Sequence, residues 1–309
     1  MIVRSLQLTD FRNYSSLQLE LGAGVHALIG DNAQGKTNLV EALVVLSTMK
    51  SFRGVTNDAA VRKGATSAFI RADIVHDDDR EFLVEIEFKS AGRSVAQVNR
   101  KRIVRTRDLL GVLRTTVFMP DDRNLVHGGA SERRALLDDA VVAVEPSRLD
   151  LVSELERVVR QRNALLKDAG YRPSSAVLAA LDAWDEKLAA LGDEVGAARA
   201  ALLAEMTPFV QSSYAALAGE AREVFLTYSA DWRVGGLASA LAESRENDLR
   251  RGTTTVGPHR DDVVVQLDDF ASRTQGSHGE QHSLGIALRM AVHQVVTKRW
   301  SSPPVVVLD

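Results

Sequence analysis

The chain has no cysteine among its 309 residues. A disulfide framework, a thiolate metal site and a thiol nucleophile are therefore excluded. No apolar run approaches the roughly 18–20 residues that span a bilayer, and the N-terminal stretch mixes charged with apolar residues, unlike a signal peptide. We therefore expect a soluble cytoplasmic protein with no membrane partner.

The chain also lacks a large excess of positive or negative charge, since its net charge is only −3. The sequence as a whole shows no nucleic-acid signature, so any contact with DNA has to come from local basic patches. The hydrophobic content of 45% over 309 residues is enough for a large core, which we expect in two domains or lobes.

Strand patterns dominate both ends of the chain. Alternating or continuous apolar residues predict strands at 17–21, 25–29, 68–105, 253–267 and 305–309. The sequence HDDDRE before Phe82 predicts a hairpin turn within the third of these regions. A helix from about 280 to 299 separates the last two.

Helical spacing takes over between about 131 and 225. An a/d seam of three heptads comprises Leu181, Trp184, Leu188, Leu191, Val195, Ala198 and Leu202. A looser stripe at 152–166 is interrupted by Arg162, and the sequence GYRPSS at 170–175 separates the two stripes. Two such helices are expected to pack antiparallel as a protruding arm, although an ordinary helical lobe would carry the same stripes.

The predicted fold is thus α/β, with a mixed sheet and helices. Residues 1–125 form the N-terminal part of a head, residues 126–250 form an inserted helical lobe or arm, and residues 251–309 form the C-terminal part of the head.

Residues 30–37, GDNAQGKT, match the pattern G-x-x-x-x-G-K-[ST] between an apolar run and a helical pattern. Glycines let successive N–H groups point at phosphate oxygens, the lysine reaches the β- and γ-phosphates, and the threonine hydroxyl is a ligand for Mg²⁺. The sequence therefore predicts a nucleoside triphosphate site. Its residues are Gly30, Asp31, Asn32, Ala33, Gln34, Gly35, Lys36, Thr37 and Asn38.

Two later features narrow the class of phosphate-loop protein. The apolar strand at 305–309 ends in Asp309, which is where a Mg²⁺-organising carboxylate belongs. Ser277 and Gly279 precede a helix and offer a second anion site, although an ordinary helix cap would look the same.

The order of these motifs resembles ABC-type ATPase heads, and the helical insertion between them resembles the SMC group. Within that class the chain is similar to the RecF family. The supporting stretches are LTDFRNYSSLQLEL (8–21), VFMPDDRNLVHGGASERRALLDDAV (117–141), RQRNALLK (160–167) and TTVGPHRDDVVV (254–265).

The resemblance implies a role for each matching residue. Ser277, His278, Gly279, Glu280 and Gln281 match a signature motif that caps the γ-phosphate of ATP held by a partner subunit. Lys36 and Asp309 match catalytic positions, and Thr37 and Asp309 match the Mg²⁺ ligands. The histidines at 278 and 282 depart from a family pattern that is itself loose at these positions.

The resemblance also implies the partners. They are ATP and Mg²⁺, a second copy of the chain in an ATP-dependent homodimer, gapped or junction DNA, and the RecO and RecR proteins that help to load RecA. In the family a second acidic residue follows the strand tip, so the sequence is expected to be C-terminally truncated. The complete protein would be a weak DNA-dependent ATPase, whereas this fragment would bind ATP and hydrolyse little.

A basic stretch is the candidate DNA contact. Residues 89–107 contain seven Lys and Arg and no acid, and the candidates within them are Arg100, Lys101, Arg102 and Arg105. A solvated hairpin would explain the same residues. Arg12, Arg53 and the pair Arg133–Arg134 are further candidates, for which structural roles are equally open. No aromatic residue lies in the stretch, so a stacking platform for single-stranded bases is not indicated.

Two alternatives remain open from the residues alone. A phosphoryl-transferring kinase would need a lid and an acceptor pocket, and it would leave the Ser277–Gly279 turn without a role. A scaffold that binds ATP without turnover is the other alternative.

Overall fold

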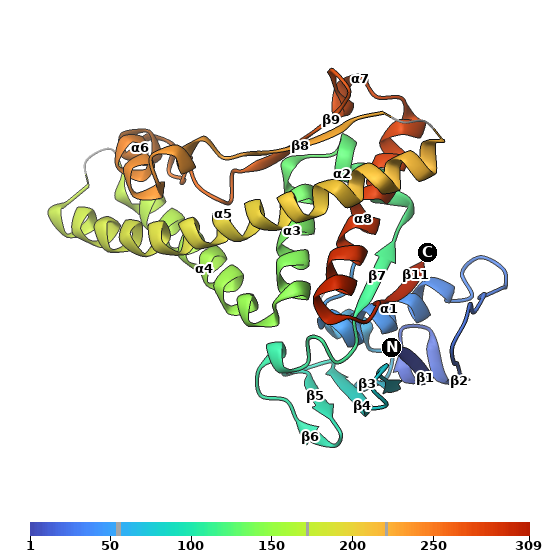
Figure 1. Ribbon diagram of the computed structural model, residues 1–309. Helices are drawn as coiled ribbons and strands as arrows, with labels where there is room; N and C mark the ends of the chain where they lie inside the picture. The colour runs from blue at the N-terminus through green and yellow to red at the C-terminus, as the bar shows by residue number, and fades with distance from the viewer. Residues whose placement is uncertain (54–56, 171–172, 220–221) are drawn as a thin grey trace. The chain divides into compact units, whose positions relative to one another are not determined.

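The computed structural model describes residues 1–53, 57–170, 173–219 and 222–309 (Figure 1). The strands are β1 (Ile2–Phe11), β2 (Tyr14–Glu20), β3 (Ser67–Val75), β4 (Glu81–Lys89), β5 (Val95–Val98), β6 (Lys101–Arg102), β7 (Thr115–Phe118), β8 (Val224–Ser229), β9 (Asp262–Leu267), β10 (Phe270–Ala271) and β11 (Val305–Leu308). The α-helices are α1 (Lys36–Thr48), α2 (Asn124–His127), α3 (Ala130–Val144), α4 (Leu149–Ala169), α5 (Ser175–Ala218), α6 (Leu237–Arg251), α7 (Ser272–Gln275) and α8 (His278–Trp300).

The chain forms two compact units. Unit 1 comprises Met1–Pro120 and His293–Asp309, and unit 2 comprises Asp121–Val292. Both ends of the sequence therefore belong to unit 1. Among the described residues, no helix is both long and apolar enough to cross a bilayer.

Unit 1 is built on an antiparallel sheet of six strands in the order β2-β1-β3-β4-β5-β6. Alternation places one face in the core: Ala68, Ile70, Ala72 and Ile74 of β3 are fully buried. The apolar face of α1, which includes Leu39, Leu43 and Leu46, joins the same core. The predicted strands at 17–21 and 68–105, with the hairpin turn before β4, are confirmed.

The predicted terminal strand is confirmed as β11, which pairs in parallel with β7. It is not the fully buried strand that its apolar sequence indicated. Only Val307 is buried, whereas Val306 and Leu308 are exposed. Apolar composition was therefore a poor guide to burial for this strand, because β7 is its only neighbour in the described sheet and side chains alternate between its two faces.

The predicted strand at 25–29 is wrong. The segment between β2 and α1 has no regular secondary structure (Figure 1), and Val25 and Ile29 are 99% and 94% exposed. A strand needs a neighbour to satisfy its backbone N–H and C=O groups. No described strand pairs with this run, so its apolar composition alone does not make it one.

Unit 2 contains the helical region and a small sheet. Helices α4 and α5 lie side by side (Figure 1), as the two stripes predicted, and Leu155 and Val159 of α4 share a core with Leu188 and Val195 of α5. Part of the expected break at 170–175, residues 171–172, lies outside the described residues. The sheet has the order β10-β9-β8. Of the stretch expected to be strand-like at 253–267, only the part from Asp262 to Leu267 is a strand, β9, because the preceding residues form turns and bends.

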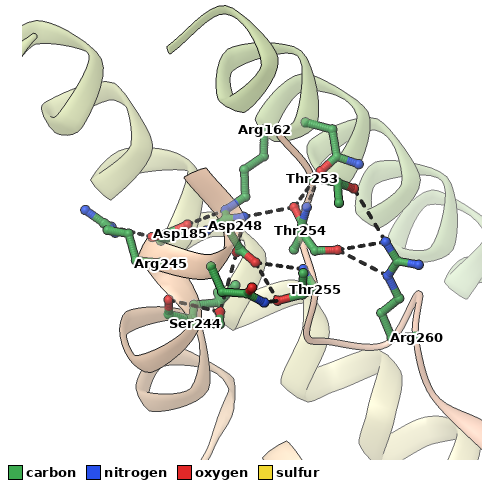
Figure 2. A network of polar contacts seen from close by, with 12 residues as sticks. Arg162, Asp185, Ser244, Arg245, Asp248, Thr253, Thr254, Thr255 and Arg260 are labelled. Atoms are coloured by element: carbon green, nitrogen blue, oxygen red, sulfur yellow. Dashed lines mark hydrogen bonds and ion pairs between the residues drawn. The ribbon is translucent and has the colours of Figure 1, made fainter. Parts of the chain in front are cut away.

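The charged residue that interrupts the stripe of α4 is the centre of a polar network (Figure 2). Arg162 is fully buried and donates to Asp185 Oδ1 at 2.5 Å, to Asp248 Oδ2 at 2.7 Å and to Thr254 Oγ1 at 2.9 Å. Arg245 of α6 forms an ion pair with the other oxygen of Asp185. Arg245 also pairs with the more exposed Asp182 of α5, so two guanidinium groups meet three carboxylates where α4, α5 and α6 come together.

Replacing Arg162 by methionine is predicted to destabilise the protein by about 3–5 kcal/mol, because buried Asp248 would lose its compensating charge. Urea unfolding followed by circular dichroism measures the change. Arg160→Met is the control, since Arg160 lies on the same helix with its side chain 68% exposed and should change stability by less than about 0.5 kcal/mol. Equal effects of the two substitutions would contradict the assigned role of the network.

Candidate functional site

The phosphate-loop sequence forms a curled loop that leads directly into α1. Ala33 and Gly35 have positive φ angles of 66° and 101°, and this alternation turns successive N–H groups inward. The ammonium group of Lys36 lies within the loop, where it donates to the carbonyl oxygens of Gly30 and Asp31, each at 2.7 Å. The loop can therefore surround an anion with backbone N–H groups and one mobile cation.

The first turn of α1 is electrostatically open to an anion. Its N-cap is Gly35, no side chain caps the helix, and no acidic residue lies in the first turn. The free N–H groups and the positive end of the helix dipole are therefore available to a phosphate.

Two residues that sequence reasoning missed hold this loop from the β1–β2 turn. Asn13 donates from Nδ2 to the carbonyl of Gln34 at 3.0 Å and accepts at Oδ1 from Asn38 at 2.7 Å. The hydroxyl of Tyr14 donates to the carbonyl of Gly35 at 3.2 Å. A Cβ atom at position 35 would lie 2.6 Å from the side chain of Asn13, so glycine is required there for close approach as well as for φ. The sequence carries no local signal for these contacts, which join positions 21 to 25 residues apart.

Asp309 lies beside the phosphate loop. The parallel pairing of β7 and β11 ends there, and the hydroxyl of Thr37 donates to Asp309 Oδ1 at 2.8 Å. A hydroxyl and a carboxylate are hard oxygen ligands, and Mg²⁺ in nucleotide sites takes one or two carboxylates together with the phosphates. The donor set thus fits Mg²⁺, with Thr37 and Asp309 as the residues that would hold it. No cluster of three or more His, Asp or Glu side chains suited to a metal occurs in the described part of the chain.

The predicted signature turn lies in unit 2, at the N-terminus of α8. Ser277 and Glu280 form a reciprocal capping box, with Ser277 N donating to Glu280 Oε2 at 2.7 Å and Glu280 N donating to Ser277 Oγ at 3.3 Å. His278 is exposed, and its Nδ1 lies 2.7 Å from Nη1 of Arg123. Gln281 is buried and donates to the carbonyl of Ser272 at 3.1 Å, which anchors the turn.

The basic stretch forms the hairpin of β5 and β6, as the sequence indicated. Asn99 and Arg100 both have positive φ angles, 51° and 63°, as a two-residue hairpin turn requires. The side chains of Arg100, Lys101, Arg102 and Arg105 are exposed, and none forms an ion pair with a described carboxylate. We call these four residues the basic hairpin.

The further arginine candidates all have partners within the fold. Arg12 forms a bidentate pair with the fully buried Glu41 of α1, and Arg53 lies 3.7 Å from the same carboxylate. Arg133 pairs with both carboxylate oxygens of Asp262, at 2.7 and 2.9 Å. Arg134 donates to the carbonyl of Asp261 at 2.7 Å. Each of these contacts gives the arginine a structural explanation.

Comparisons with known proteins agree with this geometry. A family model described as the RecF/RecN/SMC N-terminal domain matches residues 2–309. A protein of Streptomyces avermitilis named DNA replication and repair protein RecF is 39% identical, over 100% of this chain and 86% of that protein. A solved structure of the recombination mediator protein RecF with ATP in the RecFOR pathway has a TM-score of 0.92 at 26% identity, over 99% of this chain and 84% of the other.

An SMC head domain from Pyrococcus furiosus has a TM-score of 0.53 at 13% identity and shares the fold. The fold is that of the RecF- and SMC-like ABC-type ATPase heads, as the motif order predicted. Within this class, the chain belongs to the RecF family.

Replacing Asn13 by alanine is predicted to weaken ATP binding about three- to tenfold, because the loop would lose the two hydrogen bonds that fix Gln34 and Asn38. Calorimetric titration with ATP measures the affinity. Ser16→Ala, an exposed change on the neighbouring strand β2, is the control and should bind ATP as the wild type does. An Asn13 variant with unchanged affinity would show that these two hydrogen bonds are dispensable for ATP binding.

Proposed function

We propose that the protein is an ATP-dependent DNA clamp of recombinational repair and replication. The observation that carries the proposal is the hydrogen bond between Thr37 and Asp309, beside a helix N-terminus that no side chain caps. A relative at 39% identity is named a DNA replication and repair protein, and a solved relative was determined with ATP. Both relatives support the proposed function.

In this proposal the loop of residues 30–35 surrounds the phosphates with N–H groups, and Lys36 pairs with the β- and γ-phosphates. Thr37 and Asp309 hold Mg²⁺, which would neutralise charge that develops on the phosphates. The complete protein would then be a weak, DNA-stimulated ATPase. Asp309 and Lys36 contribute by binding and orienting the triphosphate.

The second half of the site comes from another copy of the chain. Ser277, at the start of α8, presents a hydroxyl and a helix N-terminus to the γ-phosphate of ATP bound by the partner subunit. ATP would thus favour a closed homodimer, and hydrolysis would release it. A kinase would have no need of this turn.

The basic hairpin would contact the phosphates of gapped or junction DNA, since its four cations have no described carboxylate partner. The solved relative is a recombination mediator protein in the RecFOR pathway. We extend this to the present chain, with RecO and RecR as partners in loading RecA.

The composite site is tested by mixing two inactive variants. Lys36→Ala removes the phosphate-binding cation, and Ser277→Arg fills the signature turn. Neither variant alone should form an ATP-dependent dimer in light scattering, but an equal mixture retains one intact composite site and should dimerise. Gapped duplex DNA should strengthen the wild-type dimer. A wild-type protein that binds ATP but stays monomeric would instead favour the alternative of a scaffold that binds ATP without turnover.

The DNA contact is tested by reversing charge at Arg100, Lys101 and Arg102. The triple glutamate variant should bind gapped DNA more weakly, and the slope of log affinity against log salt should become shallower by about 3. Arg100→Lys with Arg102→Lys is the matched control, because it retains every charge and should keep the slope. Fluorescence anisotropy over a range of salt concentrations, with ATP present, measures both. An unchanged slope in the glutamate variant would exclude the basic hairpin from the DNA interface.

A further inference from the structure

The two helix N-termini assigned to phosphate differ in their capping and in the charge of their first turns. Helix α1 has no side-chain cap and no acid in its first turn, whereas α8 carries Glu280 in its first turn. The Glu280 carboxylate accepts from Ser277 N at 2.7 Å. A negative charge at this position stabilises the helix itself but opposes a second anion at the same terminus. An uncompensated Glu280 would therefore weaken any phosphate contact made by Ser277.

Arg222 compensates this charge. Its Nη1 forms an ion pair with Glu280 Oε1, and its Nε donates to Asp268 Oδ2 at 2.7 Å. Its guanidinium carbon lies 5.1 Å from the ring centre of Phe270. Asp268 is itself fixed, since its Oδ1 accepts from the backbone N–H of Glu223 at 2.9 Å. The small sheet of unit 2 thus presents one oriented cation to the start of α8.

The directions in which the pKa values of Glu280 and Arg222 are shifted agree with this arrangement. The hydrogen bond from the backbone of Ser277, followed by the hydroxyl of Ser277 and by Arg222, holds the pKa of Glu280 below its ordinary value. The hydrogen bond to Asp268, with the Glu280 carboxylate adding to it against the cost of desolvation, raises the pKa of Arg222. Both groups are therefore charged at neutral pH.

We propose that Arg222 is a positioning residue for the signature turn. It holds the carboxylate of Glu280 in the capping position and cancels its charge, so that the hydroxyl of Ser277 and the α8 terminus can receive the γ-phosphate of the partner's ATP. This inference rests on the proposed function, because it assigns a role in the composite nucleotide site. Asp268 and Phe270 serve by orienting Arg222.

A rescue experiment separates this role from a structural one. In the Arg222→Gln variant the free Glu280 carboxylate should raise the ATP concentration needed for half-maximal dimerisation by about tenfold. Glu280→Gln, whose amide oxygen can still cap Ser277 N, leaves the Arg222 charge facing the terminus and should lower the ATP concentration needed for half-maximal dimerisation. The double variant Arg222→Gln/Glu280→Gln should recover to within about threefold of the wild type, since no charge then remains to be cancelled. Arg222→Lys should show a partial loss.

Light scattering at increasing ATP gives the midpoints, and thermal unfolding confirms that each variant is folded. A double variant as defective as Arg222→Gln would mean that Arg222 acts only by holding the sheet to α8, which overturns the inference. A dimerising wild type with an unaffected Arg222→Gln variant overturns it as well, while leaving the proposed function intact. A wild type that stays monomeric with ATP overturns the proposed function and this inference together.

Discussion

The hydrogen bond between Thr37 and Asp309 is the contact on which the candidate site depends. It joins residues 272 positions apart, so the site is complete only when both ends of the chain belong to one unit. Two pieces of secondary structure make this possible. The phosphate loop ends in α1, which places Thr37 in the first turn, and the parallel pairing of β7 with β11 fixes where the last strand ends. Parallel strands require a long crossover connection. The residues between Phe118 and Val305 meet that requirement, and they include the whole of unit 2.

The two helix termini show how the same backbone feature is adapted to different surroundings. At α1 the N-cap is a glycine with φ of 101°, the loop supplies the N–H groups, and Asn13 holds both the loop and the first turn of the helix through hydrogen bonds with Gln34 and Asn38. At α8 the cap is a serine whose own hydroxyl accepts from the backbone N–H of Glu280, so one of the N–H groups of the first turn is satisfied before any ligand arrives. An uncapped terminus gains more from an anion but is less stable without one. At the capped terminus of α8, Arg222 pairs with the capping carboxylate of Glu280, and we infer that this pairing lets the terminus tolerate an anion.

Local sequence patterns predicted most helices and strands well. They failed where the structure of a segment depends on a partner that is distant in the sequence. The phosphate loop and the hairpin turn at Asn99 and Arg100 both follow from short-range spacing, because the interactions that form them are local. The run at 25–29 has the composition of a strand, yet pairing requires a second strand that no local pattern reveals. Arginines show the same limit. Arg12 and Arg133 are open to a DNA contact or a structural role from the sequence, and only the fold shows that Glu41 and Asp262 are beside them. Asn13 carried no signal, since its partners are carbonyl and amide groups that any sequence could supply.

Arg162, which interrupts the apolar stripe of α4, determines how α4 is placed along α5. An apolar a/d seam repeats every seven residues, so on packing alone α4 could slide along α5 by a heptad and still bury leucine against leucine. The fully buried guanidinium of Arg162 has no such freedom. Its charge is compensated in the register that brings Asp185 and Asp248 within hydrogen-bond distance, at 2.5 and 2.7 Å. Any other register would leave it uncompensated at a cost of several kcal/mol. The ion pairs therefore need not add to stability over an apolar core in order to matter. They select one register of α4 on α5, and through Asp248 they fix α6 and the segment around Thr254 to it.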